Sequence, residues 1–156
     1  MMKKALAVLC GAAGLVASGA ITALADPMTD CQQLADKYRA DWNAGNAGAL
    51  ADMFDSQTGM FSNMMWTATG HAGLAAGFKQ EMGTGEKFSS ITCANATRAG
   101  DWLVSDGTWA GTGKGPDGKE MSVTGHWMSS GEYHGEKVTV LKAVVNTQMP
   151  PPPAPK

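Results

Sequence analysis

The spacing of hydrophobic residues changes once along this chain, and that change limits the folds the chain can adopt. In the first half, apolar positions recur about four residues apart, as in Leu34, Tyr38 and Trp42, which marks one face of a helix. From Lys87 onward, apolar and polar residues alternate, which is typical of strands with one buried face. Helical segments followed by a run of alternating strands predict an α+β fold.

Residues that end helices and form turns set the expected boundaries. Asp30 is the expected cap of a first helix that begins near Cys31 and ends at residues 43–46, Asn-Ala-Gly-Asn. The other expected elements before residue 87 are a second helix at about 47–54, a strand at 59–66 and a third helix at 70–82. Strands are expected near 87–98, 101–112, 119–130 and 137–147, with turns at Asp117-Gly118 and at 132–136.

Both ends of the chain differ in composition from its centre. Residues 1–25 combine a positive start, an uncharged apolar stretch and small residues before Asp26, which is the pattern of a secretory signal peptide. A retained membrane anchor is the alternative, because the apolar stretch is long enough to span a bilayer. The proline-rich residues 149–156 predict an extended tail, because proline cannot donate a backbone hydrogen bond. A single domain is therefore expected over residues 26–148.

Removal of the signal peptide changes both length and charge. The chain shortens from 156 residues to 131, and its net charge goes from −2 to −4 because Lys3 and Lys4 are lost. That length suits one domain, and the mild acidity lacks the basic surface that nucleic-acid binding requires. No later apolar run is long enough to cross a membrane. We expect a periplasmic or secreted protein with no nucleic-acid partner and no membrane contact after cleavage.

Two cysteines, Cys31 and Cys93, remain after cleavage. In an exported chain an even pair predicts a disulfide, and two buried free thiols are the alternative. Neither cysteine has a second Cys or His at ligand spacing, so no metal site is predicted there.

Cofactor motifs are missing from the sequence. It contains no P-loop, no Rossmann fingerprint and no His-Glu-x-x-His, so no cofactor is predicted. Copper(I) remains a separate alternative, since thioethers are soft ligands and Met64-Met65 and His126-x-Met128 are close groupings. Methionine is also a common core residue, which is the competing explanation.

The order of elements and several short motifs resemble the NTF2-like superfamily, and within it the SnoaL-like / DUF4440 group. The resemblance covers about residues 29–147. It is carried by residues 41–46 (DWNAGN) with Leu50 and Phe54, Gly70, 107–109 (GTW), 117–119 (DGK), 125–127 (GHW) and 138–146 (VTVLKAVVN). One departure is Lys137-Val138, where many relatives have Trp-Lys.

This resemblance implies three N-terminal helices packed on a strongly curved antiparallel (mixed) sheet that encloses a cone-shaped pocket. It also implies several functions, since members include isomerases, cyclases, dehydratases and non-catalytic binding or dimerisation modules. We expect a homodimer that binds a small, largely apolar or aromatic molecule. A cofactor-independent isomerase, cyclase or dehydratase is one alternative, and a dimerisation module is the other.

Strand alternation sorts the candidate pocket residues. Leu103, Ser105, Gly107 and Trp109 share one face of a strand, and Trp127 falls on the matching face of the next. With aromatic residues of the helices these form the predicted ligand-binding set, for which ordinary core packing is the alternative. The set is Trp42, Phe54, Trp66, Phe78, Trp109, Met121 and Trp127.

Three ionisable residues are candidate bases: Asp41, His71 and Lys142. Lys142 either faces inward, where burial would lower its pKa, or lies at a bulge or on the outer face. Asp41 ends the first helix beside Trp42, and His71 begins the third helix, where a surface position is the alternative. Strand alternation places no carboxylate clearly inside the pocket, and it puts His126 and Asp106 on the outer face.

Overall fold

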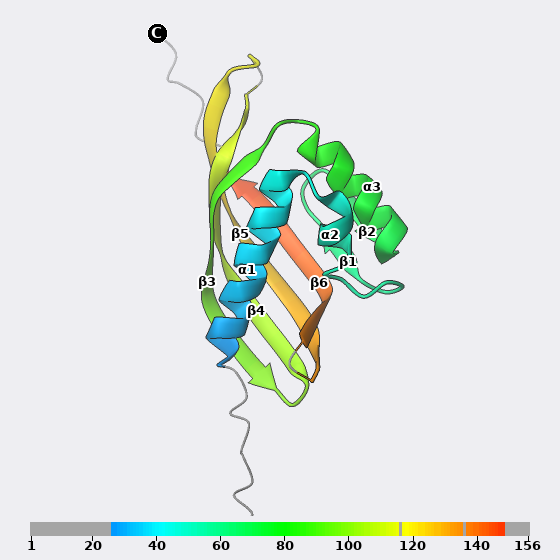
Figure 1. Cartoon of the computed structure of the whole chain (residues 1–156). Helices are drawn as coiled ribbons and strands as arrows, with labels where there is room; N and C mark the ends of the chain where they lie inside the picture. The colour runs from blue at the N-terminus through cyan, green and yellow to red at the C-terminus, as the bar shows by residue number, and fades with distance from the viewer. Residues whose placement is uncertain (1–25, 116, 136, 149–156) are drawn as a thin grey trace, which may run out of the picture.

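A six-stranded mixed sheet wraps around one long helix in this protein (Figure 1). The structure is a computed structural model that describes residues 26–115, 117–135 and 137–148. Residues 1–25 and 149–156, to which the predicted signal peptide and tail belong, lie outside the described residues. No helix among the described residues is long and apolar enough to cross a membrane.

Four long strands form most of the sheet, and two short ones extend its edge. Their order is β2-β1-β6-β5-β4-β3, and every pair is antiparallel except β1 with β6. The parallel β1–β6 pair makes the sheet mixed. The strands are β1 (Met60–Ser62), β2 (Thr67–Thr69), β3 (Lys87–Ala99), β4 (Trp102–Lys114), β5 (Glu120–His134) and β6 (Lys137–Gln148).

Helix α1 (Pro27–Ala44) begins about four residues earlier than its cap-based prediction. Pro27 occupies the first turn, where its missing N–H costs nothing, and the N-cap is Asp26. Asp30 is therefore not a cap: it is buried inside the helix and accepts a 2.7 Å hydrogen bond from the Tyr133 hydroxyl. The predicted end is confirmed, because Gly45 adopts φ 78°, a conformation that favours glycine, and closes the helix.

The segment between α1 and α3 differs from its prediction in two places. Helix α2 (Ala47–Ala51) is shorter than 47–54, because Phe54 instead forms an isolated parallel bridge with Val140 of β6. The expected strand 59–66 is shortened to β1, because residues 63–66 form a turn and β2 begins only after it. In this turn the Asn63 side chain accepts hydrogen bonds from the N–H groups of Met65 and Trp66. Helix α3 (Gly70–Met82) has the predicted bounds.

Helix α1 covers the inner face of the sheet, and α2 and α3 lie together beside the β6 side (Figure 1). The predicted alternation on β4 is confirmed, since Leu103, Ser105 and Trp109 are buried while Trp102 and Val104 are exposed.

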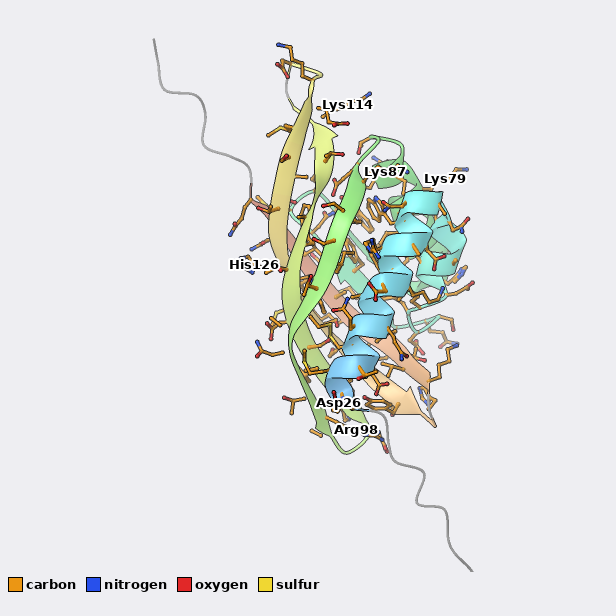
Figure 2. All side chains as sticks on the ribbon, turned by 60° about the vertical axis from the view of Figure 1, so that its left-hand side comes forward. Asp26, Lys79, Lys87, Arg98, Lys114 and His126 are labelled. Carbon is orange, nitrogen blue, oxygen red and sulfur yellow. A yellow bond between two sulfur atoms is a disulfide. The ribbon has the colours of Figure 1, made fainter. Side chains whose placement is uncertain are left out.

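The outer face of the sheet is not covered by any helix in the described part of the chain. His126 projects from this face, away from α1 (Figure 2). Trp102, Val104 and Met128 are exposed there and give the face an apolar component. The homodimer expected from the family resemblance stays a prediction.

The Cys31–Cys93 disulfide joins α1 to β3 and confirms the predicted pairing. It closes a loop of 62 residues, with the two Cα atoms 6.2 Å apart. Because both cysteines are buried in the core, the bond also fixes the start of α1 against the sheet.

Replacing both cysteines (C31A with C93A) should lower the free energy of unfolding by about 4 kcal/mol, because the unfolded chain then loses a long cross-link. Urea unfolding of the variant and of the unreduced wild type measures the difference. As a check on the bond itself, thiol titration of the unfolded, unreduced chain should find no thiol other than Cys10. Three free thiols would contradict the assignment.

Candidate functional site

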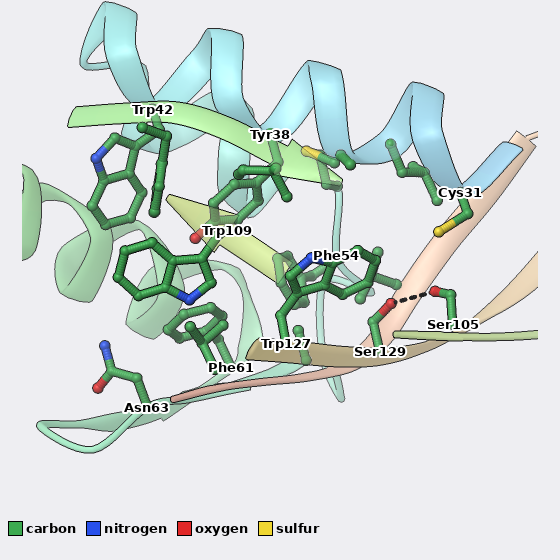
Figure 3. A pocket seen from close by; sticks show the side chains of 18 of the residues that line it. Cys31, Tyr38, Trp42, Phe54, Phe61, Asn63, Ser105, Trp109, Trp127 and Ser129 are labelled. Carbon is green, nitrogen blue, oxygen red and sulfur yellow. Dashed lines mark hydrogen bonds between the residues drawn. The ribbon is translucent and has the colours of Figure 1, made fainter. Parts of the chain in front are cut away.

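An apolar cavity of about 100 Å³ lies between α1 and the inner face of the sheet (Figure 3). Aromatic rings make up much of its wall. They come from α1, from the segment after α2 and from four strands, β1, β3, β4 and β5. The aromatic lining residues are Tyr38, Trp42, Phe54, Phe61, Phe88, Trp109 and Trp127.

One face of α1 forms the roof of the cavity. Cys31, Leu34, Ala35, Tyr38 and Trp42 all line it, and their spacing of three or four residues places them along one side of the helix. In Figure 3 Cys31, Tyr38 and Trp42 follow one another along the helix, and the Tyr38 ring is directed toward Trp109. The helical stripe visible in the sequence therefore becomes one wall of the site.

Two tryptophans and two glycines build the floor in a reciprocal arrangement. Trp109 of β4 pairs in register with Gly125 of β5, and Gly107 of β4 pairs with Trp127 of β5. A Cβ on Gly107 would lie 2.8 Å from the Trp127 ring, and one on Gly125 would collide with Nε1 of the Trp109 ring. The missing side chains thus let each indole lie close over the opposite strand.

Backbone carbonyls satisfy both indole N–H groups of the floor. Trp109 Nε1 donates to the Asn146 carbonyl at 3.1 Å, and Trp127 Nε1 donates to the Thr108 carbonyl at 3.3 Å. The ring faces can therefore contact a ligand without leaving a buried donor unpaired. At the far end of the cavity the Ser105 and Ser129 hydroxyls hydrogen-bond to each other at 2.9 Å.

The predicted pocket set divides into lining and supporting residues. Trp42, Phe54, Trp109 and Trp127 line the cavity, whereas Trp66, Phe78 and Met121 do not. Phe78 is wholly buried behind the wall, with its ring centroid 5.0 Å from Phe61 and 6.0 Å from both Tyr38 and Phe54.

The other two supporting residues pack at the edges of the site. Trp66 packs on Phe61 with the two rings tilted by 34°, and it covers Gly77 of α3, where a Cβ would meet its ring at 2.5 Å. Met121 is half-buried against the core. Tyr38, Phe61 and Phe88 were not in the predicted set, although Tyr38 belongs to the same helical stripe as Trp42.

None of the three candidate bases lines the cavity. Asp41 pairs with Lys37 at 2.6 Å on the flank of α1. His71 is exposed and hydrogen-bonds to the Asp52 carboxylate at 2.9 Å.

The inward position considered for Lys142 is wrong. Ser130 of β5 pairs with Lys142, but the next residue, Gly131, pairs with Val140, so Leu141 is an extra residue in a bulge. The bulge reverses the side-chain alternation of β6. Val140 and Ala143 therefore face the cavity, and Lys142 is exposed.

The expectation that no carboxylate faces the pocket is also wrong, because Glu81 and Glu86 line it. Glu81, near the end of α3, accepts hydrogen bonds from Trp66 Nε1 at 2.7 Å and Asn63 Nδ2 at 2.9 Å. The backbone carbonyl of Glu86 accepts a 3.0 Å hydrogen bond from Trp42 Nε1. Within the described part of the chain, the Glu86 carboxylate itself has no hydrogen-bond or ion-pair partner.

Burial shifts the titration of the groups at this end of the cavity. It raises the pKa of Glu86 to about 7, with a further contribution from the negative charge of Glu81. Burial also raises the pKa of Glu81, although the hydrogen bonds from Trp66 and Asn63 oppose the shift. The pKa of Tyr38 lies well above its usual value because of burial first, then the two glutamates. The site therefore combines a neutral phenol with a carboxyl group that changes protonation near neutral pH.

No group of three or more His, Cys, Asp or Glu side chains that could hold a metal ion occurs among the described residues. The groupings considered for copper(I) lie apart from the cavity lining. Met64 and Met65 are exposed in the β1–β2 turn, and Met128 is exposed on the outer face of β5. They do not form a common site with the cavity.

Solved structures with this fold are NTF2-like proteins. A ketosteroid isomerase-like protein from Erwinia carotovora atroseptica matches with a TM-score of 0.69 and 13% identity, over 81% of this chain and 99% of that one. An NTF2-like superfamily protein from Salmonella enterica matches with a TM-score of 0.62 and 14% identity, over 81% and 94%. An NTF-2 like protein of unknown function from Shewanella oneidensis matches with a TM-score of 0.61 and 15% identity, over 78% and 99%.

At these identities the similarity shows the fold alone, so the NTF2-like α+β fold is confirmed. No protein-family model and no curated protein matches the sequence. The narrower SnoaL-like / DUF4440 assignment stays a prediction.

Substituting Glu86 by Gln should change stability in a pH-dependent way. A carboxyl whose pKa is higher in the folded state than its ordinary 4.5 stabilises the fold below about pH 4.5, and that contribution is lost as the pH rises through about 7. E86Q stays neutral, so it should match the wild type near pH 4 and exceed it near pH 8. The expected gain is on the order of 1 kcal/mol, after allowance for partial solvent exposure.

Urea unfolding at both pH values measures this effect. E120Q, which alters an exposed carboxylate of β5, is the matched control for loss of one negative charge. A difference between E86Q and the wild type that is the same at both pH values would contradict the burial of this carboxyl.

Proposed function

We propose that this chain binds a small, largely apolar or aromatic molecule in the cavity between α1 and the sheet. The observation that carries the proposal is the cavity of about 100 Å³ walled by indole and phenyl rings. The N–H groups of the two floor tryptophans are already bonded to backbone carbonyls, so the rings offer apolar faces. A concave apolar pocket with a few polar groups is the common form of a small-molecule site.

The size of the cavity and its polar ends define what fits. At about 100 Å³ this cavity is smaller than the apolar cavity of about 150 Å³ that accommodates benzene, so a ligand would bury at most one ring in it. The Tyr38 hydroxyl lies at the cavity, has no hydrogen-bond partner among the described residues and is a group that would orient such a ligand.

We also propose that residues 1–25 direct export and that the mature protein is periplasmic or secreted. The Cys31–Cys93 disulfide supports this, since such bonds persist in oxidising compartments.

A second candidate function is cofactor-independent acid–base catalysis of the isomerase type. It is favoured by the Glu86 carboxyl, whose pKa of about 7 suits proton transfer near neutral pH, beside the phenol of Tyr38. In such a reaction Glu86 takes the proton from a carbon next to a carbonyl. Tyr38 donates a hydrogen bond to the developing enolate oxygen, and the proton returns to another carbon. The similarity to a ketosteroid isomerase-like protein is consistent with this chemistry but is a similarity of fold.

The binding proposal predicts a specific effect of filling the cavity. Ala143 of β6 lines it, and A143L places a larger side chain inside, so binding of 2-phenylethanol should weaken by about tenfold or more. Val144, the next residue, does not line the cavity, so V144L is the matched control and should bind within about twofold of the wild type. Ligand-observed NMR titration measures both. Equal binding by A143L and the wild type would place the ligand elsewhere.

The catalytic candidate predicts proton exchange. In D2O the wild type should accelerate deuterium incorporation next to the carbonyl of phenylacetone, as followed by NMR. E86Q should lose about 100-fold or more of that acceleration because the proton acceptor is gone. An absence of acceleration by the wild type would end the catalytic candidate and leave the binding proposal intact.

A further inference from the structure

The ionisable acidic and basic side chains that line the cavity are all acidic. Among the described lining residues the only acidic or basic side chains are Glu81 and Glu86, and no Lys, Arg or His lines the cavity. Both carboxyls raise the pKa of Tyr38 through their charge, so they act on the same end of the site. A ligand that enters this end therefore meets a negative potential.

The lysine side chains nearest to these carboxyls in the sequence or on α1 and α3 do not pair with them. Lys87, next in sequence to Glu86, donates from Nζ to the Asn43 carbonyl at 2.8 Å. Lys37 pairs with Asp41, and Lys79 of α3 does not line the cavity. In the described part of the chain no cation lies within ion-pair distance of either glutamate.

The two acids differ in how far their hydrogen-bonding capacity is used. Glu81 already accepts two hydrogen bonds, from Trp66 and Asn63. Glu86 accepts none at its carboxylate among the described residues. The Tyr38 hydroxyl, which lines the same cavity, also has no hydrogen-bond partner there. These two groups leave acceptor positions open toward the cavity.

Aromatic rings stand beside the open acceptors. The Trp42 ring centroid is 5.9 Å from that of Tyr38 and 5.0 Å from that of Phe88, and Phe88 is 5.3 Å from Trp109. The faces of such rings attract cations, and most strongly those of tryptophan. Carboxylates next to a group of aromatic rings form an environment that favours an organic ammonium ion over a neutral or anionic group.

We propose that the ligand of this cavity is an arylalkylamine, an aromatic ring with an aliphatic amine, in its protonated ammonium form. This inference rests on the proposed binding function and names its ligand class. The ring lies over the Trp109–Trp127 floor, and the ammonium group donates to the Glu86 carboxylate and to the Tyr38 hydroxyl oxygen. A neutral ligand would leave the Glu86 charge uncompensated, and a carboxylate ligand would add a third negative charge beside Glu81 and Glu86.

Three probes of similar shape and different charge test the proposal on the full chain: 2-phenylethylamine, 2-phenylethanol and 3-phenylpropionate. At about pH 8 the amine is protonated and Glu86 is largely ionised. NMR titration should show the amine binding about tenfold or more tighter than the alcohol, with the acid weakest. That preference should shrink in about 0.5 M NaCl.

Two variants distinguish an effect of the Glu86 carboxylate from an effect of the protein's net negative charge. E86Q should lose the preference for the amine over the alcohol, and a cooperative urea unfolding transition shows that the variant is folded. E120Q removes an exposed charge far from the lining set and should keep the preference.

The outcomes distinguish the two proposals. If the alcohol binds and the amine binds no tighter, the ligand class proposed here is overturned and the binding function stands. If the amine is preferred but E86Q keeps that preference, the proposal is again overturned, because the selectivity then comes from general charge. If none of the probes binds, the binding function fails and the ligand class fails with it.

Discussion

The reciprocal tryptophan–glycine pairs of β4 and β5 are the constraint on which the rest of the site depends. Each indole lies over a position that has no Cβ, and any side chain at Gly107 or Gly125 would collide with a ring or with backbone of the next strand. The two rings therefore form a floor close to the sheet, held by hydrogen bonds to the carbonyls of Asn146 and Thr108. The disulfide from Cys31 to Cys93 fixes α1 above that floor, and the space between them is the cavity.

The proposed functions follow from the apolar walls of this cavity and from the one carboxyl in it that has no hydrogen-bond or ion-pair partner. Its walls are apolar, so a charged group in it is costly unless it is compensated. Glu81 is compensated by Trp66 and Asn63, whereas Glu86 is not, and burial therefore moves the pKa of Glu86 to about 7. A carboxyl in that state can serve as the partner of a ligand cation or as a proton acceptor. The proposed ligand class and the catalytic candidate thus depend on the same side chain, and they differ in whether a C–H bond of the ligand is broken.

Local patterns in the sequence predicted much of this arrangement. Strand alternation placed Trp109 and Trp127 on the inner face, and the helical period placed Trp42 above them. The sequence left the direction of the Lys142 side chain undecided between the inner and the outer face of the sheet. One extra residue, Leu141, reverses the alternation of β6, and no local pattern marks that bulge.

The two glutamates were missed for a different reason. Glu81 faces inward through hydrogen bonds to side chains 15 and 18 residues away, and Glu86 lies at the cavity because its backbone bonds to Trp42, 44 residues earlier. Contacts of that range follow from tertiary packing, which residue spacing does not encode.

The central claim is that an unpaired glutamate faces the apolar cavity, and its titration tests that claim most directly. The side-chain carboxyl carbon of Glu86, assigned in ¹³C-labelled protein by comparison with E86Q, can be followed by NMR across the acidic and neutral range. The account predicts a pKa of about 7, lowered when 2-phenylethylamine is bound because the ammonium ion favours the ionised carboxylate. A midpoint at the ordinary value of 4.5, unchanged by the amine, would contradict it.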